Sequence, residues 1–144
     1  MILLATDLKQ VIMDQAQAEY PHECGGMLLG SFLPDGSRSV GELFKVENAR
    51  QDSRHNRILL LPQDVMRAEK HARQQGLDVI GYYHSHPNAP AVPSQYDLEH
   101  ALPVWSYLIA SVIDGNAADM RSWQMQNDRS TFDEEIIRSQ AEDE

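Results

Sequence analysis

The chain has 144 residues, of which 42% are hydrophobic and 24% charged, as in a single water-soluble globular domain with its own core. A formal net charge of −10 argues against nucleic acid as the main partner, and no apolar run approaches the roughly 20 residues that span a membrane. Cys24 is the single cysteine, which excludes an internal disulfide, so we expect a cytoplasmic protein.

Helical and strand patterns alternate in the first half of the chain. Pro21 ends the first helix, because the residue before a proline is pushed towards extended backbone. Pro62 suits the first turn of a second helix, and Gly76 suits its C-terminal cap. In chain order, the predicted elements are a helix around 8–16, strands over 24–32 and 40–46 joined by a turn at 34–36, a strand over 58–61 and a helix over 62–75.

The second half is richer in strand patterns. A loop with three prolines cannot be regular structure, but it is stiff, and Ser94 after it suits a helix N-cap. The predicted elements are a buried strand over 77–86, the loop over 87–93, a helix over 94–102, strands over 107–113 and 120–126, and a strand or helix over 132–137. Hairpins mixed with helices predict an α+β fold, a sheet packed by helices.

Nothing in the sequence divides the chain into several domains. We find no repeat and no linker, so we expect one domain over 1–138 and an acidic C-terminal tail over 139–144. Such a tail is typical of a solvated terminus. The basic stretch over 50–57 is predicted to be an exposed loop, which could contact an acidic partner.

The segment His84-Ser85-His86, followed by Ser94 and Asp97, carries the chemistry of this chain. Two histidines and a carboxylate form the ligand set of a catalytic zinc site, with the fourth position left for water. Alternate side chains of an extended segment share a face, so His84 and His86 can bind one ion together. Ser94 and Asp97 also fit the capping box of a helix, which needs no metal. Helix capping and a role at the metal site are compatible.

Hydrolysis at such a site further needs a base and a donor for the oxyanion. Glu23 is the best candidate base, since it lies at the mouth of a predicted strand before Gly25 and Gly26. Two glycines there are unusual unless another backbone comes close. The distance from Glu23 to the histidines does not follow from one sequence.

These residues together resemble a known family. Glu23 with Gly25-Gly26-Met27-Leu28-Leu29-Gly30, His84-Ser85-His86-Pro87 and Ser94-Gln95-Tyr96-Asp97 is similar to the motif of the JAMM (MPN-plus) zinc metalloproteases. The similarity extends from the first helix to about Gln126, and the motif is highly specific. It implies a curved mixed β-sheet flanked by helices, the MPN/JAMM (cytidine-deaminase-like) domain.

The resemblance also implies a role for each motif residue. Zn²⁺ would be held by His84, His86 and Asp97, Glu23 would activate the zinc-bound water, and Ser94 would steady the oxyanion. The family hydrolyses peptide or isopeptide bonds at the C-terminal tails of ubiquitin and ubiquitin-like proteins. A narrow groove beside the site would favour glycine-rich tails, because only glycine lets a substrate backbone lie so close.

The short, stand-alone length matches prokaryotic members, which implies a ubiquitin-like protein of the β-grasp, sulfur-carrier type as substrate. Two alternatives stay open. One is a non-catalytic MPN scaffold, although the complete ligand set speaks against it, and the other is a zinc amidase acting on small peptides. Edge strands leave a homodimer open as well.

Other chemically capable side chains receive structural interpretations. Cys24 is expected to be a small buried hydrophobic residue rather than a nucleophile. Tyr82, Tyr83, Trp105 and Trp123 are expected in the core or in the wall of a groove, and the sequence does not sort them.

Overall fold

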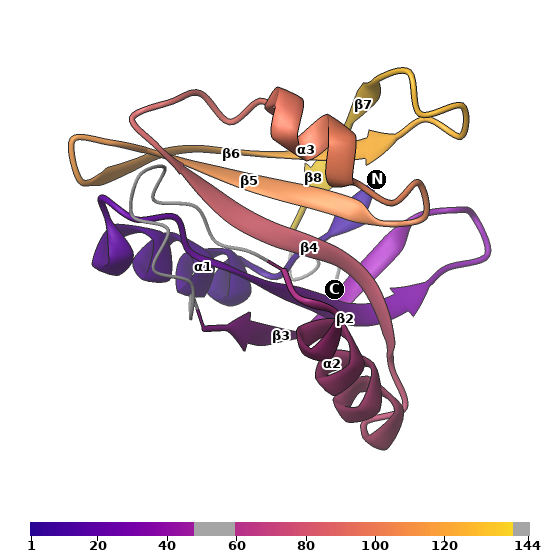
Figure 1. Cartoon of the computed structure of the whole chain (residues 1–144). Coiled ribbons are helices and arrows are strands. Elements are labelled where there is room, and N and C mark those ends of the chain that lie inside the picture. The colour runs from indigo at the N-terminus through magenta and orange to yellow at the C-terminus, as the bar shows by residue number, and fades with distance from the viewer. Residues whose placement is uncertain (48–59, 140–144) are drawn as a thin grey trace.

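The computed structural model describes residues 1–47 and 60–139, so the basic stretch over 50–57 and nearly all of the tail over 139–144 lie outside the described residues. Figure 1 shows the helices packed around one sheet. The helices are α1 (Thr6–Glu19), α2 (Pro62–Gln74) and α3 (Gln95–His100). The strands are β1 (Ile2–Leu3), β2 (Gly25–Phe32), β3 (Arg38–Val46), β4 (Asp78–Pro87), β5 (Ser106–Ile113), β6 (Asn116–Met125), β7 (Phe132–Glu135) and β8 (Ile137–Arg138). Within the described ranges, none of the helices combines the length and the apolar composition needed to cross a membrane.

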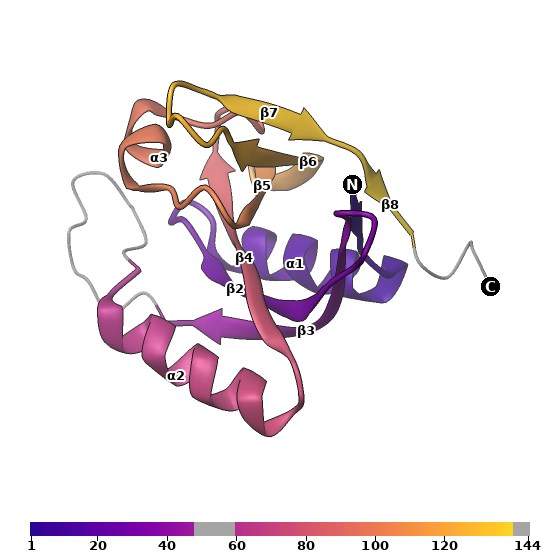
Figure 2. The same ribbon diagram turned by 90° about the vertical axis from the view of Figure 1, so that its right-hand side faces the viewer.

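The sheet is mixed and curved. Its strand order is β7-β6-β5-β4-β2-β3-β1-β8, with β4–β5, β1–β3 and β1–β8 parallel and the other pairs antiparallel. The strands at the two ends of this order, β7 and β8, are separated in the chain by Ile136 alone, so the sheet must curl until its edges approach each other (Figure 2). The expected curved mixed sheet of an α+β domain is therefore confirmed.

Local signals placed most boundaries correctly. Helix α1 ends at Glu19, two residues before Pro21, and the residue between them is extended. Strands β2 and β3 form the predicted hairpin. Helix α2 begins at Pro62, and Gly76 follows it with the positive φ of 71° that a C-terminal glycine allows.

Strand β6 begins four residues earlier than the predicted 120–126. Asp114 and Gly115 both have positive φ and form a two-residue turn, so Ile113 already pairs with Asn116. An Asp-Gly pair is a strong signal for such a hairpin, because both residues tolerate positive φ. The composition over 116–119 concealed the strand, but this turn could have revealed it.

Three further predictions need correction or limits. The helix predicted to reach residue 102 ends at His100, because a proline follows at 103 and helices end before such a residue. The segment over 132–137 forms two short strands and no helix. The strand predicted over 58–61 lies half outside the described residues, and its two described residues belong to no strand.

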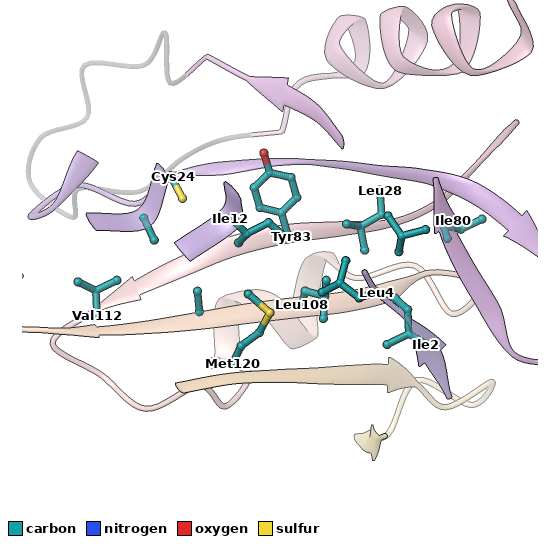
Figure 3. Close-up of a cluster of buried hydrophobic side chains, with 13 residues drawn as sticks. Ile2, Leu4, Ile12, Cys24, Leu28, Ile80, Tyr83, Leu108, Val112 and Met120 are labelled. Carbon is teal, nitrogen blue, oxygen red and sulfur yellow. The ribbon is translucent and has the colours of Figure 1, made fainter. Parts of the chain in front are cut away.

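The two faces of the sheet carry separate hydrophobic clusters. The first lies between the sheet and α1 and includes Ile12 and Leu108 (Figure 3). The second lies on the opposite face and includes Ala68 of α2 and Trp105. Burial of apolar surface on both faces is the main force that holds the helices against the sheet.

The alternation of side chains along β4 connects this packing to the predicted site. Tyr83 belongs to the cluster under α1, whereas Tyr82 belongs to the cluster on the other face. The ring of His84 stacks on that of Tyr82, and the ring of His86 lies next to the ring of His84. The two histidines therefore share the face opposite α1, as the spacing predicted.

A glycine in β4 permits the close approach of β5. A Cβ atom on Gly81 would lie 2.2 Å from the carbonyl oxygen of Ser106, far inside contact distance. We predict that Gly81→Ala lowers the free energy of unfolding by about 1–3 kcal/mol, measured by urea denaturation. Gly41→Ala is the control, since its Cβ would meet Leu77 at an ordinary 3.5 Å. Equal stability losses in both variants would contradict this packing argument.

Candidate metal centre

Three predicted ligands converge at the C-terminal end of β4. Nε2 of His84 lies 3.1 Å from Nε2 of His86. The carboxylate of Asp97 meets both rings, with Oδ1 3.2 Å from the first nitrogen and Oδ2 3.2 Å from the second. Both histidines are buried, with 3% and 8% of their surface exposed. Among the described residues, these three side chains are the group whose donor atoms converge closely enough to hold one metal ion.

The spacing of the three donors fits a tetrahedral zinc ion. Zinc bonds to nitrogen and carboxylate oxygen are about 2.0–2.1 Å long, so tetrahedral neighbours lie about 3.3 Å apart. The observed separations of 3.1–3.2 Å need only small outward movements to reach that value. The donor set also matches, because two imidazoles and one carboxylate leave a fourth position for water or substrate.

The two histidine rings are held in different ways. The Nδ1 atom of His86 donates to the carbonyl oxygen of Pro90 at 3.1 Å, which turns its Nε2 atom towards the cluster. The Nδ1 atom of His84 is buried and makes no hydrogen bond to any residue that the structure describes. Instead, its ring stacks on Tyr82, with ring centres 5.5 Å apart and planes 22° apart. Packing therefore orients His84, and a hydrogen bond orients His86.

The electrostatics of the cluster favour an ionised carboxylate. Burial raises the pKa of Asp97, but hydrogen bonds from His84 and His86 outweigh burial and hold the pKa far below its usual range. Burial lowers the pKa of His86, whereas Asp97 and the carbonyl of Pro90 raise it, and the net shift is upward. Asp97 is therefore ionised at any physiological pH, as a carboxylate that binds a metal ion must be.

Ser94 and Asp97 form a capping box while the carboxylate faces the histidines. The backbone N–H of Asp97 donates to Oγ of Ser94 at 3.1 Å, and the N–H of Ser94 donates to Oδ2 of Asp97 at 2.8 Å. The predicted N-cap is thus confirmed. The capping role is compatible with the predicted metal role, because the first turn of α3 fixes the carboxylate that completes the donor cluster.

The proline-rich loop before α3 is fixed through three successive carbonyl groups. Each accepts a hydrogen bond from a side chain of a different strand, so β4, β5 and β6 all hold the loop. The pairs, with their donor–acceptor distances, are Ser111 Oγ to Ala89 (2.6 Å), His86 Nδ1 to Pro90 (3.1 Å) and Trp123 Nε1 to Ala91 (3.0 Å). This connection carries Asp97 back to the histidines. Two of its donors, Ser111 and Trp123, lie 22 and 32 residues from their acceptors in the chain, so no sequence signal marks these two contacts.

Strand pairing brings Glu23 to the same place. Strands β2 and β4 are antiparallel neighbours, and Gly25 pairs with His84, so the residues just before β2 lie beside those after His84. Burial and, after it, the charge of Glu23 raise the pKa of Tyr82 well above its ordinary value. The step from Glu23 to the histidines, which the sequence left open, therefore follows from this register.

One pocket of about 280 Å³ joins the motif residues. Its lining includes Glu23, His84, Ser94 and Asp97. The remaining lining is mostly apolar and comes from the start of α2, from β4 and β5, and from the end of α3. A substrate in this pocket would therefore meet a carboxylate, a hydroxyl and the donor cluster at once.

The aromatic residues separate into three roles. Tyr82 and Trp105 line the pocket, and Tyr83 is buried in the core with 1% of its surface exposed. Trp123 is only partly buried and holds the proline-rich loop, a role that the sequence did not reveal.

Cys24 is fully buried as expected, and burial raises the pKa of its thiol to about 11, which disfavours a nucleophilic thiolate.

Comparisons with known proteins agree with this geometry. The family described as prokaryotic homologs of the JAB domain matches residues 5–126. A protein of Haloferax volcanii named desampylase is 32% identical over 113 residues, which are 75% of this chain and 78% of that protein. A solution structure of a Salinibacter ruber protein is 38% identical, with a TM-score of 0.75 over 96% of this chain and 91% of that one. The crystal structure of a JAB1/MPN domain protein from Archaeoglobus fulgidus, 17% identical, shares the fold with a TM-score of 0.57 over 96% of each chain.

Proposed function

Because the chain belongs to the family of prokaryotic JAB-domain proteins, we propose that it is a zinc-dependent peptidase or isopeptidase of the JAMM type. Its substrate would be the C-terminal tail of a ubiquitin-like protein of the β-grasp, sulfur-carrier type. The observation that carries the proposal is the cluster of His84, His86 and Asp97, two of whose members, His84 and Asp97, line one pocket together with Glu23. The relative named desampylase supports the substrate class.

The residues of the pocket divide the chemistry among them. A zinc ion held by His84, His86 and Asp97 would polarise the substrate carbonyl and would lower the pKa of water, so that a hydroxide nucleophile is available near neutral pH. Glu23 would accept a proton from the attacking water and deliver it to the leaving nitrogen. The Oγ atom of Ser94 accepts the N–H of Asp97, so its own proton can be donated to the carbonyl oxygen.

The complete set of groups argues against a non-catalytic scaffold. A scaffold needs neither three converging metal donors nor a carboxylate and a hydroxyl in the same pocket.

The protein would act in the cytoplasm, where the buried thiol of Cys24 stays reduced.

The proposal is tested with a β-grasp carrier that bears a short extension after Gly-Gly. We expect the purified protein to remove the extension, seen as a loss of mass in the intact carrier. A chelator should abolish the reaction, and added zinc should restore it. A free peptide with the same extension is the second substrate, since faster cleavage of the peptide would favour a small-peptide amidase. Cleavage that survives chelation would contradict the proposal.

The carbonyl contacts of the proline-rich loop make a separate prediction. Trp123→Phe removes the N–H that binds Ala91 and should weaken zinc binding about 10-fold, because it loosens the segment that carries Asp97. The measurement is a zinc titration against a competing chelator. Tyr83→Phe is the matched control, since it loses a single hydrogen bond to Gln15 on the opposite face. Unchanged zinc affinity in folded Trp123→Phe protein would contradict the role of this contact.

A further inference from the structure

We propose that the apolar part of the pocket binds a large apolar side chain, belonging to the substrate residue that leaves after the cut. This inference rests on the proposed function and goes beyond it, because it names the chemical class of the group that the enzyme removes. The glycine-rich tail alone does not account for a pocket of this size and composition.

A series of rings leads from the donor cluster into this part of the pocket. Tyr82 stacks on His84, with ring centres 5.5 Å apart. Tyr107 follows at 6.4 Å from Tyr82 in an edge-to-face arrangement, and Trp105 follows at 6.3 Å from Tyr107. The three aromatic residues keep only 7–8% of their surface exposed, so the rings form a firm wall. A side chain placed against this wall starts directly beside the reacting atoms.

Aliphatic side chains complete this apolar lining. They belong to Leu60, Pro62 and Val65 before and within α2, and to Leu102 after α3. The whole pocket, including the end lined by Glu23, His84 and Asp97, has a volume of about 280 Å³, just below the range of pockets that hold drug-sized ligands. Its apolar part therefore suits a single side chain.

Polar groups do not compete for this space. The hydroxyl of Tyr107 accepts the backbone N–H of Leu102 at 2.7 Å and is thereby engaged within the protein. The carboxylate and imidazole groups among the described lining residues are those of Glu23, His84, Asp97 and His100. All except His100 belong to the reacting end. Away from His100, a charged substrate side chain would lose its hydration here without gaining a partner.

The identity of the substrate residue follows from the chemistry of the tail. The residues before the cut are glycines under the proposed function, and glycine has no side chain to fill a pocket. Glu23, which would protonate the leaving nitrogen, lines the same pocket. In a peptide-bond substrate, the residue that carries this nitrogen is therefore the one whose side chain enters the apolar part.

The test compares carriers that end in Gly-Gly-Phe, Gly-Gly-Gly and Gly-Gly-Asp. Burial of a large apolar side chain should make kcat/KM about 10- to 100-fold higher for Phe than for Gly, and Asp should be poorest. Equal kcat/KM values for the three carriers would overturn the inference but keep the proposed function. Absence of cleavage for all three, with zinc present, would instead overturn the proposed function.

Two exposed residues near each other provide a matched pair of variants. Leu102 lines the pocket and is 47% exposed, whereas Val104 is 61% exposed and lies outside it. Leu102→Trp should reduce the Phe-to-Gly ratio of kcat/KM at least about 5-fold by filling space, and Val104→Trp should leave the ratio unchanged. Leu102→Lys should raise kcat/KM for the Asp carrier relative to that for the Phe carrier. An unchanged ratio in Leu102→Trp, or an equal fall in Val104→Trp, would contradict the location of the site.

Discussion

Glu23→Gln should lower kcat for tail cleavage by about 10²- to 10⁴-fold while the zinc content stays the same. Glutamine has nearly the same shape, but its amide cannot accept and return a proton at neutral pH. Glu23 lies outside the donor cluster, so its replacement removes proton transfer and keeps the three metal donors. The measurement is single-turnover cleavage of the carrier, together with metal analysis of the same preparation.

Glu69→Gln is the control for this substitution. Glu69 is an exposed residue of α2 that does not line the pocket, so its loss of charge should leave kcat unchanged. Full activity in the Glu23→Gln variant would show that Glu23 is not the catalytic base. Loss of zinc from that variant would show that Glu23 serves as a ligand instead.

Asp97→Asn should weaken zinc binding at least about 100-fold and abolish cleavage at limiting zinc. Asparagine keeps a side-chain oxygen that can accept the N–H of Ser94, so the cap of α3 should persist. The charge that faces His84 and His86 is lost, and a neutral amide is a poor ligand for zinc. This variant therefore separates the two roles of Asp97.

Thermal unfolding with and without zinc gives the readout for Asp97→Asn. A ligand present at 100 times its dissociation constant stabilises the native state by about 2.7 kcal/mol, so zinc should raise the Tm of the unaltered protein. The Asn variant should lose this increase. Asp78→Asn, an exposed position at the start of β4, should retain it. A zinc-dependent increase of the same size in Asp97→Asn would exclude Asp97 as a ligand.

Local patterns predicted the parts of the fold that depend on neighbours in the chain. Pro21 restricts the residue before it, and Pro62 and Gly76 act on their own backbone dihedrals, so the ends of α1 and α2 could be found without a structure. The alternation over β4 likewise placed His84 and His86 on one face.

Long-range pairing could not be predicted in the same way. The neighbours of β4 are β2 and β5, and the register of Gly25 with His84 depends on both strands and on the helices that cover them. Glu23 reached the pocket through this register, which explains why sequence reasoning relied on a family resemblance for that step. The contact of Trp123 with the proline-rich loop, formed across 32 residues, had no signal at all.

The candidate site shows the same division. The motif predicted the three side chains that converge, His84, His86 and Asp97, and the capping serine, because residue type and spacing carry this information. The apolar wall could be predicted only in part: Tyr82 and Trp105 were expected in the core or in the wall of a groove, and Tyr107 only in a strand. Its assignment required the packing of the sheet against α2 and α3.

The central claim is that His84, His86 and Asp97 together hold one zinc ion. The most direct measurement is metal analysis of the gently purified protein, combined with X-ray absorption at the zinc edge. We predict about one zinc per chain, with two imidazole nitrogens and carboxylate oxygen in its coordination shell. A content below about half a zinc per chain that added zinc does not raise, or a shell without imidazole, would contradict the account.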